Sequence, residues 1–262
     1  MIDIHSHLLP AVDDGADDIE ETIALAMAAT EAGTEIMVAT PHTLNGVYRN
    51  SRPNILRQVK SVGEIIGEKK IPLKILPGAD VALTPELIPC LESGDLMTIN
   101  DAGKYILVEL PPYYDPEKIH KIIFHLQVNG ITPIITHPER DALILKNPDI
   151  LRALIDRGCL SQITAMSITG GFGRTVEVFS KRLIECSLVH IIASDCHSID
   201  KRGPSMQGAY QIVSALSGYE NAQNMAVHRP QAVVDGAAID IPPYKSVNKK
   251  RSGWFWRKFI DR

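Results

Sequence analysis

The first forty residues read MIDIHSHLLPAVDDGADDIEETIALAMAATEAGTEIMVAT (residues 1–40) and contain a complete strand–helix–strand pattern. Short apolar runs at Ile2–His5 and Ile36–Thr40 are typical of strands that are buried on both faces. Between them, the stretch Asp18–Ala32 begins with acidic residues and stops at Gly33, as a helix does. Because a helix joins them, the two strands are expected to lie parallel in one sheet.

The same alternation continues to about residue 198. Further strands are predicted at Leu73–Leu76, Tyr105–Glu109, Thr132–Thr136, Leu160–Thr164 and His190–Ser194. Further helices are predicted at Ile55–Ile66, Pro116–Val128, Pro148–Arg157 and Thr175–Cys186. A last helical pattern runs from Pro204 to about Met225 and then loosens. Strands that alternate with helices in this way predict an α/β barrel, with a doubly wound open sheet as the alternative.

Composition limits the class of protein. The chain has 262 residues, of which 45% are hydrophobic and 22% charged, as expected for one globular α/β domain. A net charge of −4 argues against nucleic-acid binding. The four cysteines form no CxxC pair, so neither a structural zinc site nor a disulfide framework is expected. With no signal-peptide pattern and no membrane-spanning apolar run, the expected location is cytoplasmic.

The last stretch, YKSVNKKRSGWFWRKFIDR (residues 244–262), differs from the rest because it is basic and contains both tryptophans. We therefore predict a domain at residues 1–243 and a basic aromatic C-terminal tail at residues 244–262. Cationic and aromatic residues mixed in this way are typical of segments that lie at a membrane surface. A helix that packs its aromatic side chains on its own domain or on a neighbouring subunit fits the composition equally well.

Residues that bind metals gather where the predicted strands end. They are His5, His7, His42, Asp80, Glu109, His137, Asp195 and His197, with Asp13 and Asp14 in the loop after the first strand. In barrels the C-terminal ends of the strands build the active site. Imidazole and carboxylate groups are ligands of divalent transition metals. Residues two apart in a strand point to the same side, so His5 and His7 can bind one ion together.

Each of these residues alone has a simpler explanation. One HxH or DxH pair is more often accidental, and a lone histidine at a strand end is more often structural; His120, His125, His190 and His228 are interpreted as structural. Together, however, so many buried acceptors and carboxylates would be very costly without a cation. The joint pattern therefore predicts a metal centre.

The motifs MIDIHSHLLPAVDDGADD, ATPH, PGADV, LVELPPYYDP, GITPIITHPER, QITAMSITGGFG and IIASDCHS resemble those of the PHP (polymerase and histidinol phosphatase) superfamily. Within it, LPPYYDP and QITAMSITGGFG point to the CpsB/CapC family of bacterial tyrosine-protein phosphatases. The resemblance covers roughly residues 1–240, with all motifs in order. It implies a distorted, TIM-like (β/α)7 barrel, so that residues 1–243 form a PHP phosphatase domain.

The resemblance also implies three divalent ions, with Mn²⁺ preferred and Fe²⁺ or Zn²⁺ as alternatives. The first ion would be held by His5, His7 and Asp195, with Asp80 bridging to the second. Glu109 and His137 would complete the ligand set of the second ion. His42 and His197 would bind the third ion, with Asp14 rather than Asp13 as the carboxylate ligand. Asp3 is expected to orient an imidazole from behind.

Two positions depart from the family pattern. Asp80 stands where the family usually has glutamate, one methylene longer, which puts the bridge between two ions in question. Gly203, in HSIDKRGPSM, replaces a proline and is expected to make that loop more flexible.

The implied reaction is hydrolysis of a phosphate monoester by a metal-activated hydroxide. Arg140 and Arg202 match family arginines and are the expected phosphate-binding residues, because a guanidinium donates two parallel hydrogen bonds to a phosphoryl group. Cys196 precedes Arg202 by the six positions of a CX5R motif, but it lies inside the metal motif and not in a glycine-rich loop. We therefore interpret Cys196 as a bystander.

The implied substrate is phosphotyrosine on a membrane-bound bacterial tyrosine autokinase that controls capsule or exopolysaccharide synthesis. The enzyme would then be cytoplasmic and peripheral to the inner face of the membrane, and a homo-oligomer is compatible with the resemblance. Two alternatives stay open. One is a small-molecule phosphatase of the histidinol-phosphate type, and the other is a catalytically degraded PHP domain that serves as a regulatory binding module, supported only by Asp80.

Overall fold

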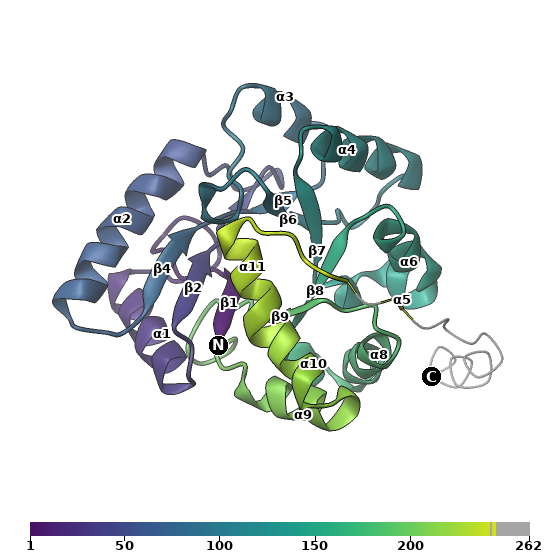
Figure 1. Ribbon diagram of the computed structural model, residues 1–262. Helices are drawn as coiled ribbons and strands as arrows, with labels where there is room; N and C mark the ends of the chain where they lie inside the picture. The colour runs from purple at the N-terminus through teal and green to yellow at the C-terminus, as the bar shows by residue number, and fades with distance from the viewer. Residues whose placement is uncertain (242, 245–262) are drawn as a thin grey trace.

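Parallel strands form the centre of the computed structural model, which describes residues 1–241 and 243–244 (Figure 1). Hydrogen bonds group them into one sheet of order β1-β2-β4 and another of order β3-β5-β6-β7-β8-β9. The strands are β1 (Ile2–Ser6), β2 (Ile36–Ala39), β3 (His42–Thr43), β4 (Lys74–Pro77), β5 (Asp80–Ala82), β6 (Tyr105–Glu109), β7 (Thr132–Thr136), β8 (Leu160–Thr164) and β9 (Ile191–Ala193). The seven predicted strands are confirmed, and β3 and β5 were not predicted.

The two additional strands continue predicted ones after a short break. Pro41 separates β2 from β3 and has no N–H with which to continue the ladder. Gly78 separates β4 from β5, where a Cβ atom would lie 2.8 Å from Val38 Cγ1 and 2.9 Å from Thr40 Cγ2. These breaks redirect the chain, and β3 and β5 then begin with His42 and Asp80, two of the predicted metal ligands.

The first and last strands of the barrel lie side by side. Asp195 N donates to His5 O at 2.8 Å, and His7 N donates to Cys196 O at 2.8 Å. The polar residues that follow β9 are thereby held against those at the end of β1. This arrangement agrees with the predicted TIM-like α/β fold and favours a barrel over an open sheet.

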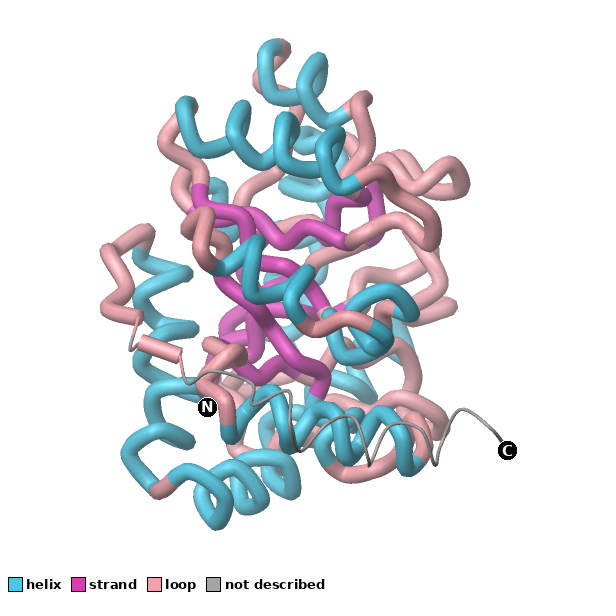
Figure 2. Tube along the Cα trace, turned by 90° about the vertical axis from the view of Figure 1, so that its right-hand side faces the viewer, coloured by secondary structure: helices cyan, strands magenta, loops and turns pink. Residues whose placement is uncertain are grey.

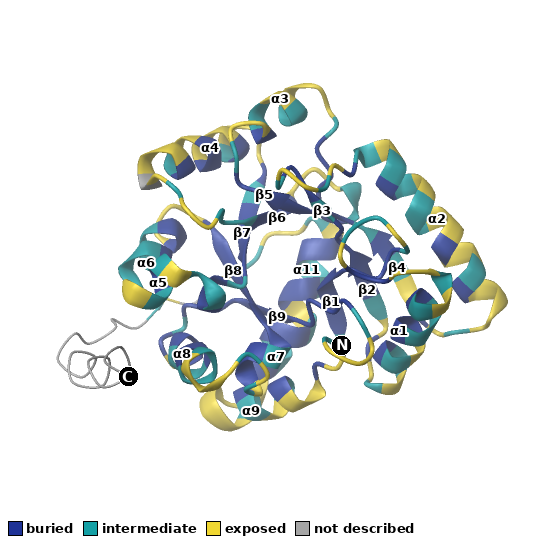
Figure 3. Ribbon diagram, turned by 180° about the vertical axis from the view of Figure 1, so that it is seen from behind, coloured by how far each residue is buried: buried dark blue, intermediate teal, exposed yellow. Residues whose placement is uncertain are grey.

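Helices surround the strands, as the side view shows (Figure 2). They are α1 (Ile19–Glu31), α2 (Arg52–Glu68), α3 (Leu87–Glu92), α4 (Pro116–Val128), α5 (Ala142–Lys146), α6 (Asp149–Ile155), α7 (Ala165–Ile168), α8 (Arg174–Glu185), α9 (Gln207–Ser217), α10 (Tyr219–Gln223) and α11 (Arg229–Asp235). Short helical turns also occur at Ile99–Asp101, Pro138–Arg140 and Asn224–His228. Exposed residues lie on the outer faces of the helices, whereas most strand residues are buried (Figure 3).

The prediction that the helical pattern loosens after about Met225 is wrong. A π-helical turn at Asn224–His228 continues directly into α11. Pro230 does not end the helix; it lies at the start of α11, directly after the π-helical turn.

The barrel interior is filled by one or two apolar side chains from most strands. They include Ile4, Val38, Leu76, Leu107, Ile134, Leu160 and Ile191. Val233 and Val234 of α11 pack on them, and Asn100 Nδ2 donates to Val234 O at 3.0 Å. Helix α11 thus covers the N-terminal end of the strands (Figure 1), so that the C-terminal end is left for the site.

Within the described part of the chain, no helix is long and apolar enough to cross a bilayer. Residues 245–262, which make up nearly all of the predicted tail, lie outside the described residues. The predicted boundary between the domain and the C-terminal tail, at residues 243 and 244, therefore stays a prediction.

Candidate metal centre

The nine predicted ligands lie together at the C-terminal end of the strands, although they come from points throughout the chain. They are His5, His7, Asp14, His42, Asp80, Glu109, His137, Asp195 and His197. Their side chains form three neighbouring clusters, described in turn below.

The first cluster is completely buried. Its two imidazole Nε2 atoms, from His5 and His7, lie 3.2 Å apart. Asp195 Oδ1 lies 3.5 Å from each of them. Asp80 Oδ2 lies 3.6 Å from His5 Nε2. Ligand atoms of His5, His7 and Asp80 lie within 4.8 Å of one another, and Asp195 Oδ1 is close to both histidines, an arrangement that suits a divalent metal.

Both imidazoles of the first cluster are oriented by hydrogen bonds at Nδ1, the ring nitrogen that faces away from the cluster. His5 Nδ1 is 2.8 Å from Gln162 Oε1, and His7 Nδ1 is 2.7 Å from Asp13 Oδ2. With Nδ1 engaged in this way, each Nε2 is directed into the cluster. The prediction did not include Gln162, although this residue opens the QITAMSITGGFG motif and is a buried polar side chain in β8.

Asp3 does not orient an imidazole, so that prediction is wrong. Its carboxylate accepts hydrogen bonds from His5 N at 3.2 Å, from Ser194 N at 3.0 Å and from Ser194 Oγ at 2.5 Å. The side chain is turned towards β9 and joins the backbones of the first and last strands. Asp13 and Gln162 take the orienting role instead.

The second cluster surrounds Asp80 Oδ2. His42 Nδ1 lies 3.4 Å from this oxygen and 3.8 Å from Glu109 Oε2. His137 Nε2 lies 4.0 Å from Asp80 Oδ2 and 3.6 Å from Glu109 Oε1. Asp80 thus contributes to two clusters, despite being shorter than glutamate, because β5 brings its backbone to the centre of the site.

The third cluster is the most exposed. Asp14 Oδ1 lies 3.6 Å from His42 Nε2 and 3.6 Å from His197 Nε2, and the side chain of Asp14 is 52% exposed. His42 therefore faces the second cluster with one ring nitrogen and the third with the other, whereas the sequence predicted only the third. Asp13 is engaged with His7 and with His42 N at 2.9 Å, which leaves Asp14 as the free carboxylate here.

Several buried atoms in these clusters have no hydrogen-bond partner within the described residues. They are His42 Nδ1, Asp80 Oδ2 and His197 Nε2. Unpartnered buried polar atoms are costly, and nitrogen and oxygen donors in this arrangement suit divalent cations. The residues present therefore fit a multinuclear metal centre.

The acid–base properties of the centre agree with this fit. Burial lowers the pKa of His5, and burial together with the charge of His7 lowers the pKa of His197 to about 2, so both are neutral, the form that binds a metal. Burial alone would lower the pKa of His7, but Asp13 and Asp195 outweigh it and raise this pKa to about 10. A cation at the first cluster would compete with that proton.

Two ligand residues adopt a left-handed backbone. His137 has a φ of 34° and Asp195 a φ of 53°. Non-glycine residues in this region are uncommon and strained by roughly 1–3 kcal/mol. In both cases the turn directs the side chain at a strand end into the centre.

Arg140 and Arg202 lie beside the metal centre. The Nη2 atoms of both donate to Asp195 Oδ2, each at 2.5 Å. The other oxygen of Asp195 faces His5 and His7, so one carboxylate joins the arginine pair to the first cluster. Both arginines line an open cleft of about 690 Å³ that also includes Glu109 and the exposed Tyr113.

Cys196 is fully buried, and burial raises the pKa of its thiol to about 12. A buried, protonated thiol is a poor nucleophile. This supports the interpretation of Cys196 as a bystander.

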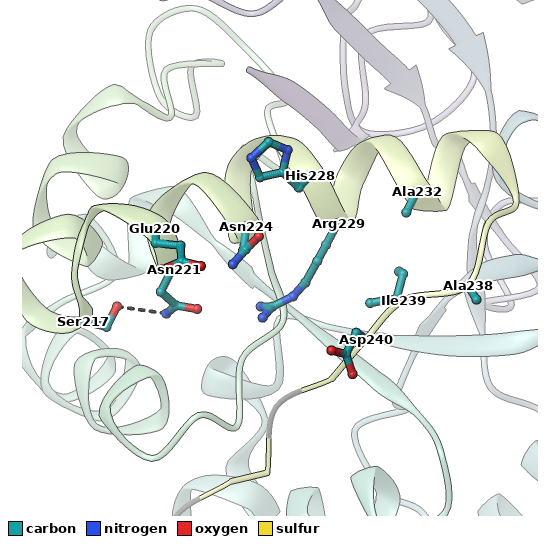
Figure 4. A pocket seen from close by; sticks show the side chains of 10 residues that line it. All are labelled: Ser217, Glu220, Asn221, Asn224, His228, Arg229, Ala232, Ala238, Ile239 and Asp240. Atoms are coloured by element: carbon teal, nitrogen blue, oxygen red, sulfur yellow. Dashed lines mark hydrogen bonds between the residues drawn. The ribbon is translucent and has the colours of Figure 1, made fainter.

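A second hollow, of about 490 Å³, lies between α10 and α11 and the chain segment that follows them (Figure 4). The described residues that line it include none of the nine predicted ligands. Arg229, its central side chain, already donates to His190 O at 3.0 Å and is close to the charge of Asp240. The chemistry that the sequence predicts therefore belongs to the other end of the barrel.

An α/β barrel with clustered histidines and carboxylates at the C-terminal strand ends defines the broad class of metal-dependent barrel enzymes. Within that class, the family described as "Capsular polysaccharide synthesis, CpsB/CapC" matches residues 1–235. The chain belongs to the CpsB/CapC family, which confirms the resemblance found in its motifs.

Relatives in this family match the chain over nearly its whole length. Tyrosine-protein phosphatase YwqE of Bacillus subtilis is 35% identical over 97% of this chain and 100% of its own. Tyrosine-protein phosphatase CpsB of Streptococcus pneumoniae is 34% identical over 89% of this chain and 98% of its own. A crystal structure from work on YwqE and CpsB, described as unique metal-dependent tyrosine phosphatases, superimposes with a TM-score of 0.90 and covers 95% of this chain and 100% of its own.

Proposed function

We propose that this protein is a metal-dependent protein-tyrosine phosphatase. One observation carries the proposal: three clusters of metal-binding side chains meet at one end of the barrel, with two arginines joined to them through Asp195. Membership of a family whose named relatives are tyrosine-protein phosphatases supports the same activity.

In this proposal the three clusters hold three divalent ions, with Mn²⁺ preferred over Fe²⁺ and Zn²⁺. The ligands of the first ion are His5, His7, Asp80 and Asp195; those of the second are His42, Asp80, Glu109 and His137; those of the third are Asp14, His42 and His197. Bound ions would lower the pKa of a water and neutralise charge on the phosphoryl oxygens.

The residues of the chain bind and orient the phosphate monoester. Arg140 and Arg202 offer paired hydrogen-bond donors on one side of the cleft. When a phosphoryl dianion binds there, its oxygens replace part of the contact that the two arginines make with Asp195. The cleft is open towards Tyr113, so an aromatic leaving group has room to extend out of it.

The proposed substrate is phosphotyrosine on a membrane-bound tyrosine autokinase that acts in capsule or exopolysaccharide synthesis. The description of the family as one of capsular polysaccharide synthesis supports this context. A phosphatase of such a kinase would be cytoplasmic and peripheral to the membrane.

The first test is phosphate release from a phosphotyrosine peptide, with histidinol phosphate and a phosphoserine peptide alongside, in metal-free buffer and then with Mn²⁺. Metal-restored activity that favours phosphotyrosine is expected. A preference for histidinol phosphate would keep the metal centre and overturn the substrate. No activity with any metal, from folded protein, would favour a regulatory binding module.

The phosphate-binding role of Arg140 is tested by Arg140→Ala. Loss of a preorganised donor of this kind slows turnover by about 100-fold or more, while metal content should be unchanged. Arg174→Ala is the matched control, because Arg174 is a surface arginine whose side chain is 73% exposed. Loss of bound metal from Arg140→Ala would contradict the assignment.

The proposed membrane contact is tested by deleting residues 245–262 and measuring binding to liposomes that contain anionic lipid. Weaker binding of the shortened chain is expected from its loss of basic and aromatic residues. Unchanged binding would exclude a membrane role for these residues.

A further inference from the structure

Phe172 contacts both of the arginines that line the cleft. The guanidinium carbon of Arg140 lies 4.8 Å from the centre of the Phe172 ring, and that of Arg202 lies 5.7 Å from it. Both distances are in the range of cation–π interactions. The two arginines therefore share an aromatic ring as well as the carboxylate oxygen of Asp195.

The turn that carries Phe172 depends on its glycines. Gly170 and Gly173 have φ values of 91° and 92°, a region that other residues rarely adopt. A Cβ atom on Gly171 would lie 2.4 Å from Met166 Cγ. The GGFG sequence thus forms a tight turn from which Phe172 is the only side chain that projects.

A buried carboxylate ties this turn to Arg140. Glu139, fully buried, accepts hydrogen bonds from Thr164 N at 3.1 Å and from Ser167 Oγ at 2.6 Å. Ser167 belongs to α7, the short helix that leads into the GGFG turn. The backbone beside Arg140 and the turn beneath Phe172 are therefore fixed relative to each other.

The two guanidinium groups meet at one carboxylate oxygen and repel each other, because both are positively charged and a single carboxylate neutralises only one positive charge. The negative face of an aromatic ring attracts both cations without adding a competing hydrogen-bond acceptor. The Nε atoms of Arg140 and Arg202 are also buried without a hydrogen-bond partner among the described residues, so they remain available as donors.

We propose that Phe172 is a positioning residue whose ring holds Arg140 and Arg202 together as one phosphoryl-binding unit. The identity of the bound group rests on the proposed phosphatase function, whereas the positioning itself rests on the contacts described above. Two cation–π contacts of ordinary strength correspond to roughly 5- to 30-fold in binding affinity.

The experiment is calorimetric titration of metal-loaded protein with inorganic phosphate, which has no aromatic ring. Phe172→Leu should bind phosphate roughly 5- to 30-fold more weakly, with unchanged metal content and an unchanged unfolding temperature. Phe172→Tyr keeps the aromatic face and should bind as the wild type does. The control is Phe124→Leu, the same change at a side chain that is 63% exposed.

Three other outcomes are informative. Wild-type affinity for phosphate in Phe172→Leu would overturn the inference. Normal phosphate binding combined with slower hydrolysis of aryl phosphates alone would also overturn it, because the ring would then contact the leaving group instead. A wild-type protein that binds phosphate but hydrolyses no phosphotyrosine would contradict the proposed function and leave the Phe172 comparison measurable.

Discussion

Asp80 shows how much can depend on one residue. Its Oδ2 lies within 4.0 Å of ring nitrogens from three histidines: His5, His42 and His137. The sequence raised the question of whether an aspartate is long enough to bridge two ions. The distances show that it reaches both clusters, because its backbone lies on β5 at the centre of the site. That it binds two ions stays a prediction.

We expect Asp80→Asn to bind at least one divalent ion fewer per chain, because the change removes a negative charge that both clusters share. Metal content after gel filtration measures this directly. Asp80→Glu, which keeps the charge and restores the usual family residue, should retain the ions. Full metal content in Asp80→Asn would contradict the bridging role.

His190 affects stability and lies away from the metal centre. Burial, with a smaller effect from the charge of Arg229, lowers its pKa to about 4, and Ser161 N donates to its Nδ1 at 3.0 Å. The ordinary histidine pKa is about 6.5. Between these pH values the unfolded chain takes up a proton that the folded chain does not. The free energy of unfolding therefore falls as the pH drops from about 6.5 to about 4, and His190 causes no such loss of stability above pH 6.5.

At pH 5 this effect corresponds to about 2 kcal/mol. His190→Asn removes the titrating group, so the stability gap between wild type and variant at pH 7.5 should shrink by about that amount at pH 5. Urea unfolding at the two pH values measures the gap, and effects of pH on the metal centre cancel between the two proteins. An equal gap at both pH values would argue against the lowered pKa.

At the scale of elements, the loop after β6 forms the rim of the cleft. Pro111 and Pro112 limit its backbone freedom, and Tyr113 follows them with 93% of its surface exposed. An exposed aromatic side chain at the mouth of a cleft can pack against the ring of a phosphotyrosine.

We therefore expect Tyr113→Ala to raise KM for a phosphotyrosine peptide about 3- to 10-fold, the size of one aromatic pair, with little change in kcat. An alkyl phosphate should be hydrolysed as by the wild type. Tyr219→Ala, at a tyrosine that is 67% exposed and outside the described lining of the cleft, is the control. Equal effects on both substrates would exclude packing against the ring.

The elements were predicted unevenly, for physical reasons. Tyr105–Glu109, Thr132–Thr136 and Leu160–Thr164 match β6, β7 and β8 residue for residue, because short runs that contain β-branched residues between helical stretches signal strands. The short strands β3 and β5 were missed. Each is only two or three residues long and is defined by its neighbours rather than by its own pattern.

At the scale of the whole molecule, bound metal should stabilise the fold. The centre joins residues from β1 to the turn after β9, and a ligand present at about 100 times its Kd contributes about 2.7 kcal/mol. Removal of metal with a chelator should therefore abolish activity and lower Tm by at least about 5 °C. Mn²⁺ should restore both, and Asp80→Asn should show a smaller shift in Tm. An unchanged Tm would mean that the clusters hold no tightly bound ion.

The sequence by itself determined the class of fold, the family and the nine candidate ligands. Strand runs, helix boundaries and the spacing of histidines and carboxylates are local patterns, and local patterns can be read along the chain. Only the tertiary structure decided how the candidate ligands are shared between clusters and which residues support them. Asp13 and Asp14 are neighbours in sequence, yet one positions His7 and the other faces the third cluster. Gln162 and Phe172 both belong to the QITAMSITGGFG motif, but only the structure shows which distant residues they contact.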